Sequence, residues 1–138
     1  MTRSVIARSV ATKQSDLSKK RCKPCEGGVQ RLSKERSVGF LKDLKEWRLS
    51  ADENSIFAEW VMKDFMSAVG LIREIARVAE RENHHPDIHL TGYRKLKIEL
   101  STHAIGGLSE NDFILAAKIT RLPKQLQSVR LHPAPPVV

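Results

Sequence analysis

Three histidines fall within a short part of the sequence, and their side chains suit proton transfer. His84 and His85 are adjacent and directly precede Pro86, and His103 lies further along the chain. Imidazole has an unperturbed pKa near about 6.5, so it can donate or accept a proton at physiological pH. Because the residue before a proline is disfavoured in the helical region, His85 cannot continue a helix that precedes it. The pair is therefore expected at a corner where a helix ends.

His103 follows a run in which apolar and polar residues alternate. Leu96, Ile98 and Leu100 are separated by single polar residues, a pattern typical of a half-buried strand. This spacing predicts that His103 lies at the end of a strand. A short hairpin between the helix corner and this strand could bring the three rings together.

A metal site is the main alternative for these histidines. His85 and His89 are separated by three residues, and His103 could be a third ligand. Two histidines at this spacing share one face only if the residues between them are helical. Pro86 and the extended residues after it do not allow that helix. We therefore expect no metal, and we interpret His89 as a surface residue.

The wider pattern resembles the pterin-4a-carbinolamine dehydratase family. The signature of that family is an acidic residue, three spacers, His-His-Pro, an aromatic residue, Thr-His and Asp. The residues of this chain that meet it are Glu80, His84, His85, Pro86, Tyr93, Thr102, His103 and Asp112. The resemblance covers roughly residues 22 to 121, and its many ordered positions make it far more specific than one short motif.

The resemblance implies a reaction and a role for each of these residues. The family eliminates water from 4a-hydroxytetrahydropterin to give quinonoid dihydropterin, in the recycling of tetrahydropterin. It implies that His84 and His103 are the acid–base pair and that His85 is a ring that positions the pterin substrate. The other residues expected to bind substrate are Glu80, Pro86, Thr102 and Asp112. No hydride or electron moves in this reaction, so no cofactor is expected.

Three of the signature residues have a structural alternative. Asp112 is the fourth residue of a segment that begins at Ser109 and forms a fair capping box, so a structural and a functional role both stay open. Glu80 could orient a histidine, hold a pterin nitrogen or be a surface charge near Arg77. We interpret Tyr93 as an aromatic residue of the hairpin.

The resemblance also implies an alternative function of a different class. Members of the family serve as protein partners, one as a dimerisation cofactor of a transcription factor and plant relatives in Rubisco assembly. This chain could therefore be a non-catalytic interaction or assembly module on the same fold. The intact His84, His85 and His103 favour the enzyme, because a binding module has no need of three histidines in this arrangement.

The remaining pattern predicts the elements that must position these residues. The expected elements are a helix over 33–46, strands at 47–49 and 56–61, a helix over 64–82, strands at 88–91 and 93–102, and a helix over 109–121. Adjacent strand pairs with short turns favour an α+β fold, a four-stranded antiparallel sheet with three helices packed on one face. The resemblance implies the same fold.

Apolar spacing also predicts which helix faces are buried. In the first helix the expected stripe is Val38, Leu41 and Leu44; in the second it is Phe65, Val69, Ile72, Ala76 and Ala79, with Met62 and Met66 also in the core. The last helix is apolar around much of its girth, including Leu115. Such a helix is buried on several sides, by its own core or by another subunit, so we expect a homodimer or homotetramer.

The distribution of charge and the length of the apolar runs each exclude one class of partner. The net charge is +8, but ten basic and three acidic residues lie in residues 1–36, against fourteen and thirteen in residues 37–138. A nucleic-acid-binding domain carries its basic patch on the fold itself, so direct nucleic-acid binding is not expected. No apolar run is long enough to span a bilayer, so no membrane association is expected either.

The chain is expected to form one domain with two tails. Residues 1–21 form a predicted disordered extension, either a transit peptide or, as we prefer, a dispensable bacterial extension; residues 22–122 form the domain; residues 123–138 form a disordered tail. Cys22 and Cys25 lack a second cysteine pair to complete a zinc site. We expect reduced thiols and a cytoplasmic protein, with organellar import as the alternative.

Overall fold

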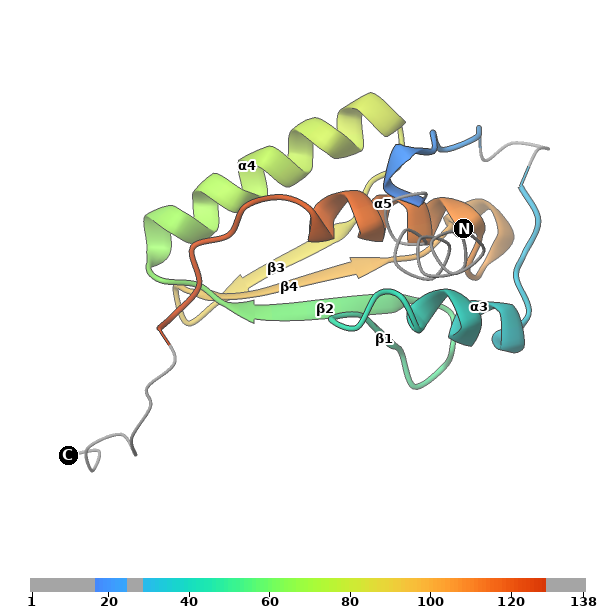
Figure 1. Ribbon diagram of the computed structural model, residues 1–138, viewed down its shortest axis with the longest axis horizontal. Coiled ribbons are helices and arrows are strands. Elements are labelled where there is room, and N and C mark those ends of the chain that lie inside the picture. The colour runs from blue at the N-terminus through green and yellow to red at the C-terminus, as the bar shows by residue number, and fades with distance from the viewer. Residues whose placement is uncertain (1–16, 25–28, 129–138) are drawn as a thin grey trace, which may run out of the picture.

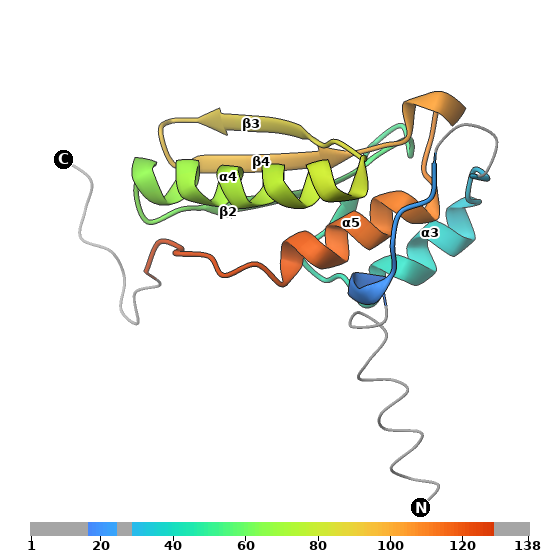
Figure 2. The same cartoon turned by 90° about the horizontal axis from the view of Figure 1, so that it is seen from above.

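The computed structural model describes residues 17–24 and 29–128 of the 138-residue chain. The elements are α3 (Lys34–Leu41), β1 (Arg48–Leu49), β2 (Ile56–Val61), α4 (Phe65–Glu82), β3 (Asp87–Thr91), β4 (Lys95–Leu100), the 3-10 turn η1 (His103–Ile105) and α5 (Glu110–Thr120). The strands form one antiparallel sheet in the order β1-β2-β4-β3, and the helices lie on one of its faces (Figures 1 and 2). The predicted α+β fold is confirmed.

The two central strands, β2 and β4, form one side of the hydrophobic core. Ala58 of β2 lies opposite Ile98 of β4, and Trp60 lies opposite Leu96; all four side chains are buried. Because successive side chains in a strand point to opposite faces, the residues between them point away from the helices. The alternation of Leu96, Ile98 and Leu100 that predicted a half-buried strand is therefore confirmed.

The ends of α4 match the prediction, but its buried face does not. Asp64 caps the helix by accepting a hydrogen bond from the Ser67 N–H at 2.8 Å. The residues that face the core are Ala68, Leu71, Ile75, Val78 and Ala79. Phe65, Met66 and Val69, which were predicted to be buried, are 50%, 73% and 38% exposed. The prediction was wrong because apolar residues occupy both sides of this helix, so spacing alone does not define the inner face.

The first helix also differs from the prediction. It ends at Leu41 and is followed by turns rather than continuing to residue 46. Val38, expected in its buried stripe, is exposed, whereas Ser37 is buried. Phe40 instead packs α3 against α5, because its ring stacks on Phe113 with 5.0 Å between ring centroids.

The last helix is buried by its own chain. Its apolar residues Phe113, Ile114, Leu115, Ala116, Ala117 and Ile119 are each at most 2% exposed. α5 lies between the sheet, α3, α4 and residues 17–24 (Figure 2). The apolar girth of this helix therefore does not call for a second subunit, and Leu115 does not face outward.

The contacts of the domain extend beyond the bounds of residues 22 and 122. At one end Leu17 is buried and joins the core cluster. At the other, the Lys63 N–H donates to the Gln125 carbonyl at 2.8 Å, and the Gln127 N–H donates to the Val61 carbonyl at 2.9 Å. Residues 125–127 thus pair with residues 61–63 at the end of β2. The rest of the two expected tails, residues 1–16 and 129–138, lies outside the described residues, as does Cys25. No helix in the described ranges is long and apolar enough to cross a membrane.

Candidate active site

The histidine corner is formed by the way α4 ends. Asn83 adopts a left-handed conformation with φ of 52°, and the His84 N–H donates to the Ala79 carbonyl at 3.2 Å. This is the hydrogen-bond pattern that closes many helices, and it fixes the backbone of His84. Pro86 follows, and β3 begins at Asp87. The predicted corner between helix and strand is confirmed.

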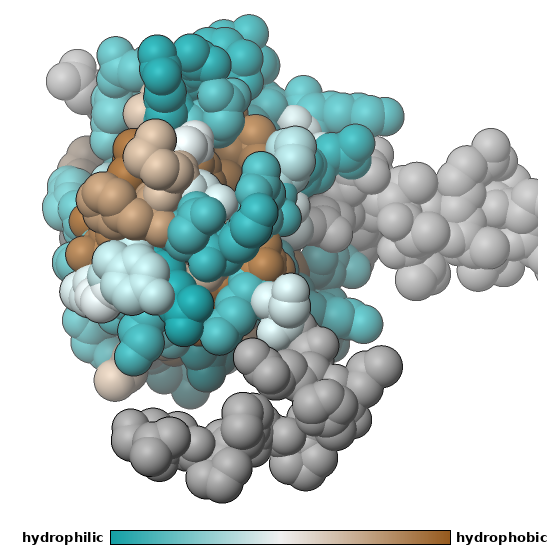
Figure 3. All heavy atoms as spheres, turned by 90° about the vertical axis from the view of Figure 1, so that its left-hand side faces the viewer, coloured by the Kyte–Doolittle hydropathy of each residue, from teal (hydrophilic) through white to brown (hydrophobic). Residues whose placement is uncertain are grey.

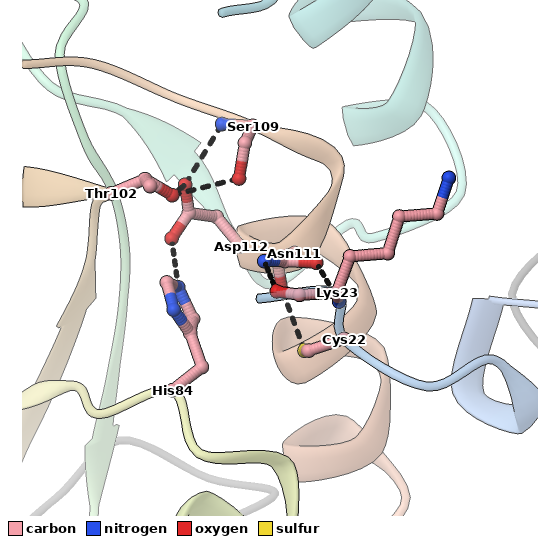
Figure 4. Close-up of polar contacts among 7 residues, drawn as sticks. All are labelled: Cys22, Lys23, His84, Thr102, Ser109, Asn111 and Asp112. Atoms are coloured by element: carbon pink, nitrogen blue, oxygen red, sulfur yellow. Dashed lines mark hydrogen bonds and ion pairs between the residues drawn. The ribbon is translucent and has the colours of Figure 1, made fainter. Parts of the chain in front are cut away.

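Asp112 is the centre of a buried polar network (Figure 4). His84 Nε2 lies 2.6 Å from Asp112 Oδ1, and the hydroxyl of Thr102 donates to Oδ2 at 2.8 Å. The backbone N–H of Ser109 also donates to Oδ2, at 3.0 Å. Asp112 is fully buried and His84 is 6% exposed. An ionised carboxylate only accepts hydrogen bonds, so with Asp112 ionised this bond is made by the Nε2–H of His84.

The structural alternative for Asp112 is confirmed, and the same side chain also contacts His84. Its bond to the Ser109 N–H caps the first turn of α5, and its other oxygen holds His84. Ser109 itself, whose hydroxyl lies 2.7 Å from that of Thr102, was recognised in the sequence only as a cap. Its position three residues before Asp112 was the signal that could have placed it in the network.

His85 and Glu80 form a second pair on the outside of the corner. His85 Nε2 lies 2.5 Å from Glu80 Oε2, and both side chains are more than half exposed. Arg77, the proposed surface partner of Glu80, instead pairs with Glu74 at 2.7 Å. Of the roles considered for Glu80, this geometry favours orientation of a histidine.

His103 lies on a short loop that is tied to the same network. The loop begins after β4, and its base is closed by a bridge in which the Thr102 N–H donates to the Gly107 carbonyl at 2.8 Å. Because the Thr102 side chain also bonds to Asp112, the loop is held against α5. His103, the first residue of η1, is exposed. His85 directly follows His84 in the chain, and His103 directly follows Thr102, so each exposed histidine is next to a residue of the Asp112 network.

Arg31 packs against the same loop and was missed in the sequence. A side chain at Gly107 would meet Arg31 Nε at 2.6 Å, so Arg31 lies directly over the Gly107 backbone. Its guanidinium donates to the Asn54 side chain at 2.9 Å. The Gly106-Gly107 pair was a signal for a close approach of two chain segments, although it could not identify the partner.

Two of the predicted residues lie away from this network. Tyr93 stands in the β3–β4 turn with φ of 55°, at the opposite end of β3 from Pro86, and the Arg94 guanidinium lies 5.3 Å from its ring. His89 is an exposed residue of β3 opposite Lys97. Within residues 17–24 and 29–128, no three His, Cys, Asp or Glu side chains are grouped to hold a metal ion.

Glu82 and Asn111 are buried polar residues that the sequence reasoning also missed. Glu82 occupies the last turn of α4, where the helix dipole disfavours an acidic side chain, and it is 8% exposed. Its carboxylate accepts a hydrogen bond from the Cys22 N–H at 2.8 Å. An acidic residue at a helix C-terminus was the only signal that Glu82 has a buried partner.

Cys22 is not poised for thiolate chemistry. Burial raises the pKa of its thiol from 9.0 to about 12, and the Glu82 carboxylate adds to the rise. The thiol is 3.6 Å from the Asn111 carbonyl, to which it donates. A reactive cysteine needs a lowered pKa, so this environment disfavours a redox role for Cys22.

The fold and the site together define a class of protein. It is a small α+β domain in which one carboxylate holds a histidine and two further histidines are open to a ligand, an arrangement suited to proton transfer. Residues 30–122 match the family described as pterin 4 alpha carbinolamine dehydratase. The chain belongs to this family of hydro-lyases.

Individual relatives agree with this assignment. The chain is 44% identical over 108 residues to a Nitrosomonas eutropha protein that bears the dehydratase name provisionally, covering 78% of this chain and 93% of that one. It is also 44% identical over 111 residues to pterin-4-alpha-carbinolamine dehydratase 2, mitochondrial, of Arabidopsis thaliana, covering 78% and 59%. A crystal structure of a transcriptional coactivator/pterin dehydratase from Brucella melitensis superposes with a TM-score of 0.62 at 28% identity, covering 66% of this chain and 96% of that one.

Proposed function

We propose that this protein dehydrates 4a-hydroxytetrahydropterin to quinonoid dihydropterin by histidine acid–base catalysis, in tetrahydropterin recycling. The observation that carries the proposal is the buried Asp112 carboxylate that binds both His84 and Thr102, next to the exposed His85 and His103. This site supplies proton donors and acceptors. Family membership supplies the substrate class.

The reaction needs two proton transfers. The leaving 4a-hydroxyl takes up a proton and departs as water, and a pterin ring nitrogen loses a proton, so the net change is loss of one water. We assign these transfers to His84 and His103. A carboxylate partner stabilises a protonated imidazole, so the bond from Asp112 suits His84 to take up a proton and release it again. Exposed His103 can meet the substrate from the other side.

The proposed binding residues divide by their exposure. His85, oriented by Glu80, and half-buried Pro86 are open enough to contact a pterin. Thr102 and Asp112 are at most 1% exposed, so we propose that they position His84 and the His103 loop instead of touching substrate. This refines the expectation that all five residues bind the pterin directly.

A dehydration assay on the purified protein tests the proposal. Carbinolamine generated in situ from tetrahydropterin is mixed with the protein, and formation of quinonoid dihydropterin is followed by ultraviolet absorbance. We expect acceleration over the spontaneous reaction, and its loss in a variant with alanine at His84, His85 and His103. A wild-type rate equal to the spontaneous rate contradicts the proposal.

A role as a protein partner is the second candidate. The Brucella melitensis structure is titled both coactivator and dehydratase, and α4 of this chain exposes Phe65, Met66 and Val69. Such a face could serve self-association or another protein, separately from the histidines.

We further propose a cytoplasmic site of action, with the organelle named for the Arabidopsis thaliana relative as the alternative. Fluorescence microscopy of the tagged full chain distinguishes the two.

A further inference from the structure

Residues 17–24 form a segment, here called the strap, that lies outside residues 30–122 of the family match. The strap crosses α5 and the end of α4 (Figures 1 and 4). Two buried side chains, Asn111 and Glu82, hold it. Asn111 immediately precedes Asp112, and Glu82 lies two residues before His84. The strap is therefore attached close to both partners of the His84–Asp112 pair, through the residue before Asp112 and the residue two before His84.

Asn111 binds the strap as a neighbouring strand would. Its Oδ1 accepts from the Lys23 N–H at 2.9 Å, and its Nδ2 donates to the Lys23 carbonyl at 2.8 Å. The Asn111 side chain is 2% exposed, and Figure 4 shows it turned toward Lys23 while Asp112 turns toward His84. The first turn of α5 is thus bonded to the strap through Asn111 and to the histidine corner through Asp112.

Glu82 binds the strap from α4. Its Oε1 accepts from the Cys22 N–H at 2.8 Å, and its Oε2 lies 3.5 Å from Arg21 Nε and 3.7 Å from Lys118 Nζ. A buried carboxylate is costly unless it is paired and hydrogen-bonded. The strap and α5 supply these partners, so Glu82 links α4 to α5 in parallel with the His84–Asp112 bond.

Other contacts secure the rest of the strap. Lys118 Nζ donates to the Ser18 carbonyl at 2.6 Å, and Leu17 is buried. Lys20 forms a 2.8 Å ion pair with Glu110 whose lysine side chain is 52% exposed. An exposed pair of this kind contributes little to stability, so the grip on the strap depends on the buried contacts.

We propose that Asn111 and Glu82 are positioning residues for the dehydration, acting through the strap to hold Asp112 and His84 at hydrogen-bonding distance; this rests on the proposed function. α4 and α5 pack together in one core, and the strap adds polar contacts to both helices next to the His84–Asp112 pair. Small displacements of reacting groups lower turnover strongly. Loss of either contact therefore lowers kcat and leaves the exposed substrate contacts in place.

The test compares Asn111→Ala and Glu82→Ala with Lys20→Ala in the full chain. We expect kcat for carbinolamine dehydration to fall about tenfold in the first two, with KM within about twofold of wild type, and Lys20→Ala to match wild type. Glu82→Gln keeps an oxygen for the Cys22 N–H and should recover most of the lost kcat. Unchanged kcat in folded Asn111→Ala, or no recovery in Glu82→Gln, overturns the proposal.

A second readout does not depend on activity. The Nε2–H of His84 is followed by ¹H–¹⁵N NMR of the imidazole, and its hydrogen-bonded signal should shift or broaden in Asn111→Ala but not in Lys20→Ala. If the wild type lacks dehydratase activity, the proposed function fails, while this signal still decides whether the strap positions His84. An unchanged signal refutes the positioning role. Asn111→Ser replaces Asn111→Ala if the alanine variant does not fold, with the same expected outcomes.

Discussion

His84 and His103, the two residues proposed for proton transfer, lie in opposite environments. His84 is almost fully buried and bound to Asp112, whereas His103 is exposed on its loop. The places of the two histidines in the fold could be predicted in part, because Pro86 marked the end of a helix and the alternating residues marked a strand. The burial of His84 could not be predicted, because it depends on a contact with Asp112 of α5, which is distant in sequence.

This difference separates the effects of two alanine variants. We expect His84→Ala and His103→Ala each to lower kcat by about 10²-fold or more, the scale of a lost acid–base group. His84→Ala should also lower the free energy of unfolding by about 1–3 kcal/mol, because it leaves a buried carboxylate short of a donor. His103→Ala should change it by at most about 0.5 kcal/mol.

Kinetic assays and urea denaturation measure the two effects, and His89→Ala is the matched control for loss of an exposed imidazole. Retention of wild-type kcat in both variants would rule out the assigned acid–base pair. Equal stability of His84→Ala and His103→Ala would contradict the burial argument alone.

The raised pKa of the Cys22 thiol predicts how its reactivity and the stability of the fold depend on pH. Its pKa of about 12 in the fold, against 9.0 when unperturbed, leaves it protonated at pH 8.5, so alkylation by iodoacetamide should be about 10²-fold or more slower in the native protein than in urea. Between pH 9.0 and about 12 the unfolded chain releases this proton and the folded chain keeps it, so Cys22 lowers stability as pH rises.

A Cys25→Ser background isolates the Cys22 thiol, since the chain has two cysteines. Mass spectrometry follows the alkylation, and unfolding curves at pH 8 and pH 10 should differ less in a Cys22→Ala derivative. Native alkylation as fast as that in urea would show that the thiol is not protected.

At the scale of elements, local signals predicted ends better than faces. Asp64 and Ser109 marked the starts of α4 and α5 because capping depends on neighbours in the chain. The inner face of α4 was wrong because Phe65 and Met66 are as apolar as the residues that face the core, and only the position of the sheet decides between them. The strap was missed for a related reason: it contains no apolar repeat, and its partners are 60 and 88 residues away in sequence.

The loop of His103 gives a prediction at this scale. Gly107→Ala places a methyl group against Arg31, whose side chain has to shift, so we expect a loss of about 1 kcal/mol in the free energy of unfolding. Gly39→Ala in α3 meets no neighbouring atom within 4 Å and should instead stabilise by about 0.5–1 kcal/mol. Urea denaturation compares them, and a Gly107→Ala variant as stable as Gly39→Ala would show that Arg31 does not constrain the loop.

At the scale of the whole molecule, we predict self-association through α4 instead of α5. Phe65, Met66 and Val69 form an exposed apolar face at the start of α4. Figure 3 shows apolar side chains gathered on this end of the molecule among charged ones. Contiguous exposed apolar surface commonly marks an interface, and a self-complementary contact closes as a symmetric dimer. A homodimer, or a tetramer built from two, stays our prediction.

Met66 is the most exposed member of this face, so its replacement tests the interface. Met66→Glu places a charge in the proposed contact and should convert the assembly to folded monomers, whereas Lys42→Glu, beyond the end of α3, should leave it intact. Leu115→Glu should unfold the domain rather than dissociate it, because that side chain is fully buried within one chain and a buried charge without a partner is costly. Light scattering gives the mass and circular dichroism the fold. A monomeric wild type at micromolar concentration, or a Met66→Glu variant that keeps the wild-type mass, would show that this face does not join two copies.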